Sequence, residues 1–194
     1  MLLPTLAVVV GLLVGLSTGG KPRWASRHAV HAPWLVVAGV VAEVVAGRWT
    51  LGWLGPMLLV GGYGFLLAFV VRNRTLLGVP VVGAGLVANL AVIVANGGMP
   101  VRPQAVVDAG ITSVAGLPAL HYGPRHHAER ASTHLPWLDD RLPVAVIHSV
   151  VSAGDVILAV GVVMVVASCM HYQGRYQRRR LGRAALAGLV RRAS

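Results

Sequence analysis

The sequence is poor in charged residues, and acids are especially scarce. Only 12% of its 194 residues are charged, six of them are Asp or Glu, and 56% are hydrophobic. A soluble domain of this length needs far more charge on its surface, so the composition argues against a soluble protein and indicates a membrane protein. Long apolar runs separated by short charged loops indicate several membrane spans within one domain.

Cysteine is nearly absent too. The single Cys169 excludes an intrachain disulfide and a zinc cluster built from thiolates. Histidine is more frequent, and five histidines cluster around the segment that joins the last two apolar runs: His121, His126, His127, His134 and His148. Their spacing matches no strong metal-binding motif, so we expect no metal and no cofactor. A pH-sensitive external surface is the alternative for these side chains.

Five apolar runs are candidates for membrane helices, because crossing roughly 30 Å of hydrocarbon takes about 20 apolar residues. They cover residues 2–16, 33–47, 52–71, 76–95 and 145–170. The runs predict an all-α integral membrane bundle of about five transmembrane helices over residues 1–170. A basic tail over 171–194 follows the bundle.

Positive charge predominates, with a formal net charge of +11. The basic residues concentrate in the first loop, the third loop and the tail, whereas the loop over 96–143 balances four arginines with four acids. The positive-inside rule therefore places the amino terminus outside and the carboxyl terminus in the cytoplasm. We expect the lipid bilayer, with anionic lipids at the tail, to be the partner of these charges, and not nucleic acid.

The fourth apolar run stops abruptly at "NGGMPVRP", residues 96–103. Asparagine and glycine terminate helices, and proline disfavours helix at the residue before it. This break opens a segment over 96–143 that is far longer than an ordinary connection. Apolar residues at helical spacing between 103 and 120 predict a short helix on the outer surface, so we expect an ordered external segment. An amphipathic lid over the helix ends is the alternative.

The fifth run carries a polar stripe. His148, Ser152 and Asp155 are four and three residues apart, so a helix beginning at Pro143 places them on one face. Asp155 then lies roughly 18 Å along the axis. An ionisable group is costly inside a membrane, so the stripe is expected to face the bundle interior. The structural alternative is a hydrogen bond from Asp155 to another helix, through Asn89.

Glu43 is another acid within an apolar run. It lies near the outer end of the run over 33–47. We expect its side chain to reach the headgroup level or to pair with Arg48, which are structural roles.

The stretch "WLDDRLP" supplies Asp139 and Asp140 just before the fifth run. Asp140 and Asp155 together suggest an aspartyl-type site, in which two carboxyl groups share one proton and activate water. A continuous helix from Pro143 argues against this, because it places Asp155 well below the level of Asp140.

Lipoprotein signal peptidases use membrane-embedded aspartates of that kind. The stretch "SAGDVILAVG", residues 152–161, is similar to the asparagine-x-aspartate helix of those enzymes. It departs from them at the asparagine, where Ser152 or Ala153 stands. The likeness is short and leaves the hydrolase as the alternative interpretation.

The stretches "NGGMPV", "THLPWLDDRLP" and "SAGDVILAVG" together resemble an uncharacterised family of small polytopic bacterial membrane proteins. The resemblance covers about residues 1–170. It implies an integral protein of the bacterial plasma membrane and no activity. Glycine is usual in that family where Asp139 stands, so Asp140 is the matching acid. The matching positions are Asn96, Gly97, Gly98, Met99, Pro100, Thr133, Leu135, Asp140, Ser152, Gly154 and Asp155.

The sequence favours a non-catalytic membrane protein, either an accessory subunit or a small-ligand binder with an external-facing polar pocket. The residues expected at that pocket are Asn96, Gly97, Gly98, Pro100, Asp140, His148, Ser152 and Asp155. A membrane protein partner or a homo-oligomer is expected with this function. The alternative is an intramembrane aspartyl-type hydrolase that uses Asp140 and Asp155. The pocket requires the break at Asn96 to lie near the face of Ser152 and Asp155.

Overall fold

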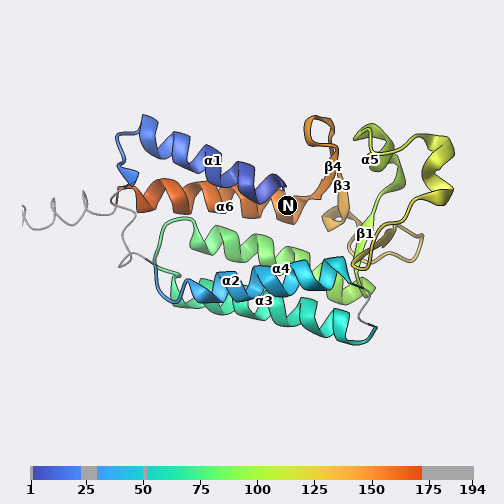
Figure 1. Ribbon diagram of the computed structural model, residues 1–194, viewed down its shortest axis with the longest axis horizontal. Coiled ribbons are helices and arrows are strands. Elements are labelled where there is room, and N and C mark those ends of the chain that lie inside the picture. Colours follow the sequence, from blue (N-terminus) through green and yellow to red (C-terminus); the bar gives the residue numbers. More distant parts are fainter. Residues whose placement is uncertain (1, 23–29, 50–51, 172–194) are drawn as a thin grey trace, which may run out of the picture.

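A computed structural model describes residues 2–22, 30–49 and 52–171. Five long helices lie side by side, and a small sheet lies at one end of them (Figure 1). The long helices are α1 (Leu2–Ser17), α2 (Trp34–Arg48), α3 (Leu54–Arg72), α4 (Val79–Asn96) and α6 (Ala153–Cys169). The basic tail predicted over 171–194 lies outside the described residues, apart from its first residue.

The all-α prediction is wrong, because the external segment and the beginning of the fifth apolar run fold into a four-stranded mixed sheet. Its strands are β1 (Met99–Val101), β2 (His126–Ala128), β3 (Asp140–Val144) and β4 (Ser149–Ser152), in the spatial order β2-β1-β3-β4. β1 is parallel to β2 and to β3, whereas β3 and β4 form an antiparallel hairpin. Strands of three to five residues are too short to leave an alternating pattern in the sequence.

The five-span prediction is wrong as well. Within the described residues, α3 and α4 are the two helices long and apolar enough to cross a membrane. The helices α1, α2 and α6 have 16, 15 and 17 residues. At about 1.5 Å per residue they reach only roughly 22–26 Å, short of the hydrocarbon thickness of about 30 Å. The first two apolar runs match α1 and α2 closely and were already short, whereas the start of the fifth run belongs to a 3-10 turn and to β4, so α6 begins only at Ala153.

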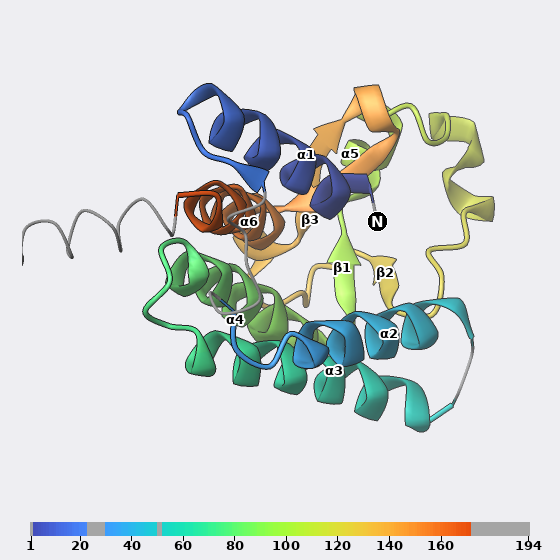
Figure 2. The ribbon, with the colours of Figure 1, turned by 60° about the vertical axis from the view of Figure 1, so that its left-hand side comes forward.

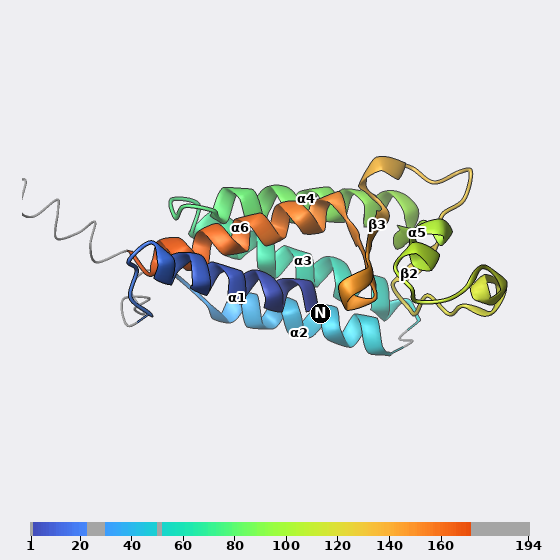
Figure 3. The same ribbon diagram turned by 90° about the horizontal axis from the view of Figure 1, so that it is seen from above.

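The segment that follows α4 begins as the sequence predicts. α4 ends at Asn96, and Gly97 adopts a left-handed backbone with φ of 70°, a conformation that favours glycine. The predicted surface helix is present as two shorter pieces, α5 (Pro103–Asp108) and a 3-10 helix (Val114–Ala119). The sheet and α5 lie together beyond one end of the helices (Figure 3).

The helices pack in a defined order. α6 contacts both α1 and α4, α2 contacts α3, and α3 contacts α4 (Figure 2). Glycines allow α4 and α6 to approach closely: a Cβ atom on Gly85 would lie 2.6 Å from the Gly154 carbonyl oxygen, and one on Gly161 would lie 2.5 Å from the Val82 nitrogen. This contact sets the position of α6, and of its first turn, relative to α4.

The outward faces of the helices stay apolar. Exposed hydrophobic side chains on α1, α2, α3 and α4 include Leu13, Val37, Met57 and Val94, each at least 60% exposed. So many exposed apolar side chains on neighbouring helices indicate contact with lipid or with another protein. Together with α3 and α4, it supports an association with the membrane.

Candidate functional site

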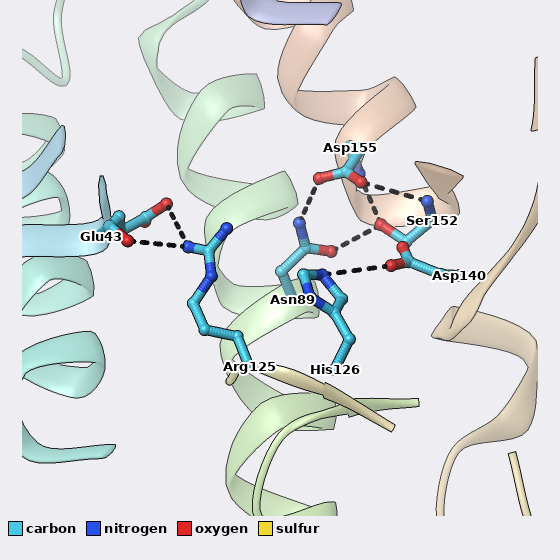
Figure 4. A network of polar contacts seen from close by, with 7 residues as sticks. All are labelled: Glu43, Asn89, Arg125, His126, Asp140, Ser152 and Asp155. Carbon is cyan, nitrogen blue, oxygen red and sulfur yellow. Dashed lines mark hydrogen bonds and ion pairs between the residues drawn. The ribbon is translucent and has the colours of Figure 1, made fainter. Parts of the chain in front are cut away.

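A polar cavity of about 130 Å³ lies where the sheet meets the helices. Six separate elements and the residue before β2 contribute polar side chains to it, and Figure 4 shows most of them. The polar lining residues are Glu43 of α2, Tyr63 of α3, Asn89 of α4, Arg125, His126 of β2, Asp140 of β3 and Asp155 of α6. The sequence brings none of these residues together locally except the neighbours Arg125 and His126.

Asp155 is fixed by a cap at the start of α6. The Ser152 hydroxyl accepts a hydrogen bond from the Asp155 backbone N–H at 2.9 Å, and Asp155 Oδ2 accepts one from the Ser152 N–H at 3.1 Å. This reciprocal capping box satisfies two backbone donors that a helix start leaves open. It also holds the carboxylate of Asp155 in one orientation, toward α4.

Asn89 on α4 completes this network. Its Nδ2 donates to Asp155 Oδ1 at 2.7 Å, and its Oδ1 accepts from the Ser152 hydroxyl at 2.9 Å. Ser152 is fully buried and Asn89 is 4% exposed. The link between Asp155 and Asn89 that the sequence offered as the structural alternative is therefore confirmed.

The predicted stripe on the fifth run is wrong. The chain from 143 to 152 forms the β3–β4 hairpin, so α6 starts at Ala153 and Asp155 lies in its first turn. His148 lies in the hairpin with φ of 43°, and its Nδ1 is 3.2 Å from the Ala109 carbonyl oxygen. The sequence pattern could not distinguish a hairpin from a helix here, because a short run of apolar β-branched residues is compatible with both buried strands and a buried helix.

Asp140 reaches the same cavity from the sheet. In the antiparallel pair of β3 and β4, Asp140 is the register partner of Ser152, and on its other side it pairs with Val101 of β1. The sheet thus sets Asp140 beside the capped start of α6 (Figure 4). The sequence argument that Asp155 lies far below Asp140 is overturned by this hairpin.

The carboxyl group of Asp140 is buried and poorly satisfied. The residue is 6% exposed, and within the described part of the chain its nearest polar partner is His126 Nε2, at 3.7 Å from Oδ2. Burial raises the pKa of Asp140 to about 8; the charges of Asp155 and Asp139 add to this, and Arg125 opposes it. Asp140 is therefore protonated at neutral pH.

His126 is held neutral beside it. Burial lowers the pKa of His126 to about 4, the nearby Arg125 lowers it further, and the charge of Asp155 opposes both. At neutral pH the contact between His126 and Asp140 thus joins a neutral imidazole to a protonated carboxyl group. It is not a salt bridge, and at 3.7 Å it is longer than a hydrogen bond.

Arg125 ties the sheet to α2. Its Nη1 donates to the Glu43 carbonyl oxygen at 3.2 Å and lies 3.6 Å from Glu43 Oε2. Its own carbonyl oxygen accepts from the Met99 N–H at 2.8 Å, which fixes it to β1. Glu43 therefore meets a residue 82 positions away instead of Arg48.

The neighbouring Asp139 belongs to a different cluster. It is fully buried, and Arg141 Nε donates to its Oδ1 at 2.8 Å. Arg141 also lies 3.6 Å from Glu129. Successive residues at the start of a strand point to opposite sides, so Asp139 joins this outer cluster while Asp140 enters the cavity.

The remaining predicted pocket residues do not line the cavity. Asn96 binds the backbone of His134 through both its amide atoms, at 2.8 and 2.9 Å. Pro100 is buried within β1, and Gly97 and Gly98 line an apolar groove beside the cavity. Of the predicted pocket residues, Asp140 and Asp155 line the cavity and Ser152 supports Asp155. The cavity also contains residues that were not predicted for it: Glu43, Tyr63, Asn89, Arg125 and His126. No group of three side chains able to hold a metal ion occurs among the described residues.

Comparison with known proteins gives a family and no activity. No curated protein and no solved structure matches the chain. The model of a family of unknown function, DUF5317, matches residues 27–167. The match includes every residue of the cavity, whereas α1 lies outside it. Because it covers most of the sequence, the chain belongs to the DUF5317 family, a family of unknown function.

Proposed function

We propose that the protein is an aspartyl-type hydrolase associated with the membrane, in which Asp140 and Asp155 are the catalytic residues. The observation that carries this is the meeting of two carboxyl groups from different elements in one small cavity. One of them accepts two fixed hydrogen bonds, and the other is protonated at neutral pH and makes no short hydrogen bond within the described residues. A pair of unequal carboxyl groups is the arrangement that activates water in aspartyl hydrolases.

The two groups have complementary roles. The Asp155 carboxylate retains lone pairs beyond those used by Asn89 and Ser152, so it takes a proton from a water molecule. The water oxygen then forms a bond to a substrate carbonyl carbon, while Asp140 gives its proton to the carbonyl oxygen. When the tetrahedral intermediate collapses, the bond to the leaving nitrogen or oxygen breaks, and that atom takes the proton from Asp155. The carbonyl forms again and returns its proton to Asp140, so both groups regain their starting states.

The membrane position of this site is part of the proposal. The helices α3 and α4 are long and apolar enough to cross a membrane. The loops after α1 and α3 lie at the end away from the sheet (Figure 1); Lys21 and Arg74 lie in these loops, and Arg72 is the last residue of α3. The positive-inside rule then puts these loops at the cytoplasmic side of a bacterial cell membrane, and the sheet, which follows α4, outside.

A non-catalytic role is the second candidate. Asn89, Ser152 and Asp155 satisfy one another's hydrogen bonds, and such a closed network also suits a rigid binding or docking site. In that case the chain is an accessory subunit or a small-ligand binder, with a membrane protein partner or a second copy. Anionic lipids would bind the basic tail in either case.

The test compares membranes from cells that produce the wild-type chain, Asp140→Asn, Asp155→Asn or a control, Asp108→Asn. Asp108 is an acid outside the cavity and accepts a hydrogen bond from Gln104. Mass spectrometry of membrane peptides and of extracted lipids identifies cleavage products that appear only when the protein is produced. We expect products in the wild type and in Asp108→Asn that are missing from both other variants.

The comparison is valid only for variants that fold as well as the wild type. Each variant is purified in detergent, and its melting temperature and size-exclusion profile are measured. If well-folded Asp140→Asn and Asp155→Asn give the same peptides and lipids as the wild type, the hydrolase proposal is wrong. Co-purification of a stoichiometric membrane protein with all variants would then favour the accessory role.

A further inference from the structure

The polar cavity is too small to hold a substrate by itself. Its volume of about 130 Å³ lies below the range of about 300–1,000 Å³ that is usual for small-molecule sites. It can hold a reacting group and a few water molecules. The rest of any substrate must therefore lie in a neighbouring space.

Such a space adjoins the cavity directly. A groove of about 530 Å³ runs between the outer ends of α2, α3 and α4. Leu59, Ile93 and Arg125 line both the groove and the cavity, so the two spaces share one wall. Arg125 is the only charged residue among the described residues that line the groove, and the others are almost all apolar.

The environment of the groove suits the hydrocarbon chain of a lipid. Val60 of α3 and Val94 of α4 line it and are 45% and 63% exposed. These are the two helices long and apolar enough to cross a membrane. An extended peptide in such a groove would leave backbone donors and acceptors unpaired, whereas a hydrocarbon chain has none to satisfy.

Arg125 supplies the polar end of this site. One of its guanidinium nitrogens binds Glu43, and a guanidinium carries five N–H donors. The remaining donors suit a carboxylate, phosphate or carbonyl oxygen at the junction of groove and cavity. Charge and shape together favour one occupant, an amphiphile with a hydrocarbon chain and an oxygen-rich polar group.

We propose that the groove holds the hydrocarbon chain of an amphiphilic substrate, whose polar group lies at Arg125 and faces Asp140 and Asp155. The reaction at the two aspartates rests on the proposed hydrolase function. The binding of the chain does not, so the two can be tested apart.

The test uses the full chain in phosphatidylcholine nanodiscs with a long-chain fatty acid that carries a photoreactive diazirine on its chain. Labelling is measured against probe concentration, with unlabelled fatty acid as competitor, and the labelled peptides are mapped by mass spectrometry. We expect saturable labelling of α3 and α4 beside the groove. Val94→Trp fills the groove and should weaken the apparent affinity for the probe at least about tenfold, which is about 1.4 kcal/mol.

The matched control is Val87→Trp, a substitution on the same helix at a residue that is 54% exposed and does not line the groove. It should label like the wild type. Arg125→Gln should weaken labelling, and Arg125→Lys should restore part of it. Asp108→Asn, which changes an acid outside the cavity, should bind the probe like the wild type.

The outcomes separate the two proposals. Labelling that never saturates, or that is equal in Val94→Trp and Val87→Trp, shows ordinary lipid contact and overturns the groove proposal while leaving the hydrolase untouched. Saturable labelling that Val94→Trp removes supports the groove, even if no product depends on Asp140 and Asp155 in the cellular test.

Discussion

Asp140 on β3 and Ser152 on β4 are register partners in an antiparallel pair, and this pairing creates the site. Ser152 also caps α6 and fixes Asp155, so a single cross-strand pair places one acid beside the other. The first acid comes from a sheet and the second from a helix. Substitutions and pH changes test this arrangement through its separate parts.

Stability should depend on pH through Asp140. Its pKa of about 8 in the folded chain lies above the ordinary value of 3.8, so unfolding releases a proton between these values and stability falls as pH rises through that window. His126, whose pKa falls to about 4 from 6.5, contributes the opposite slope, but only below about pH 6.5. Between pH 6.5 and 8 the melting temperature should therefore decrease.

Asp140→Asn isolates that contribution. The variant cannot ionise at this position, so its melting temperature in detergent should change less between pH 6.5 and 8 than that of the wild type. The Asp108→Asn protein should keep the wild-type slope. Equal slopes in all three proteins would show that Asp140 is ionised at neutral pH.

Asn89→Ala should destabilise the protein by about 2 kcal/mol, because it leaves the buried Ser152 hydroxyl and the Asp155 carboxylate without a partner. Chemical unfolding in detergent, followed by circular dichroism, measures the change. Val87→Ala, at an exposed position on the same helix, is the control and should change stability little. A similar small effect for Asn89→Ala would mean that water replaces the amide without cost.

Arg125→Gln should loosen the sheet from α2, since it removes the ion pair with Glu43 and weakens the hydrogen bond to the Glu43 carbonyl. Hydrogen exchange at the amides of β2 and at Met99 should become faster, while exchange in the middle of α6 stays slow. Arg130→Gln, at an exposed position two residues after His126–Ala128 ends, serves as the control. Unchanged exchange at β2 would assign the docking of the sheet to other contacts.

Gly85→Ala should destabilise the contact between α4 and α6 by about 1–3 kcal/mol, because the added methyl group overlaps the Gly154 carbonyl and Leu158. The contrast is Gly64→Ala on α3, where a Cβ atom meets nothing within 4 Å. That change should stabilise the helix by up to about 1 kcal/mol. The melting temperatures of both variants measure these changes in stability. A stabilising effect of Gly85→Ala would contradict the close approach of α4 and α6.

Several features were readable from the sequence because they depend on local chemistry. The apolar runs predicted four of the helices near their true bounds, and "NGG" predicted the end of α4. Asp140 and Asp155 were recognised as candidates because acids are scarce and costly next to apolar runs. The capping residues "SAGD" are present in the sequence, but they were assigned to the middle of a helix instead of its start.

Arg125, His126 and Glu43 were not recognised as one site, because nothing in the sequence relates a loop arginine to a helix 82 residues earlier. Loop residues carry no periodicity, and charge counts assigned Arg125 to topology alone. Only the pairing of three very short strands brings it over the bundle.

The sequence by itself determined the apolar helices, their turns and the supply of acids, since hydrophobicity, glycine and proline act within a few residues. Only the tertiary structure decided that the external segment is a sheet and that its strands set Asp140 beside Asp155. The reason is physical: strand pairing and burial depend on contacts between distant segments. The same burial gives Asp140 its raised pKa, which no local pattern encodes.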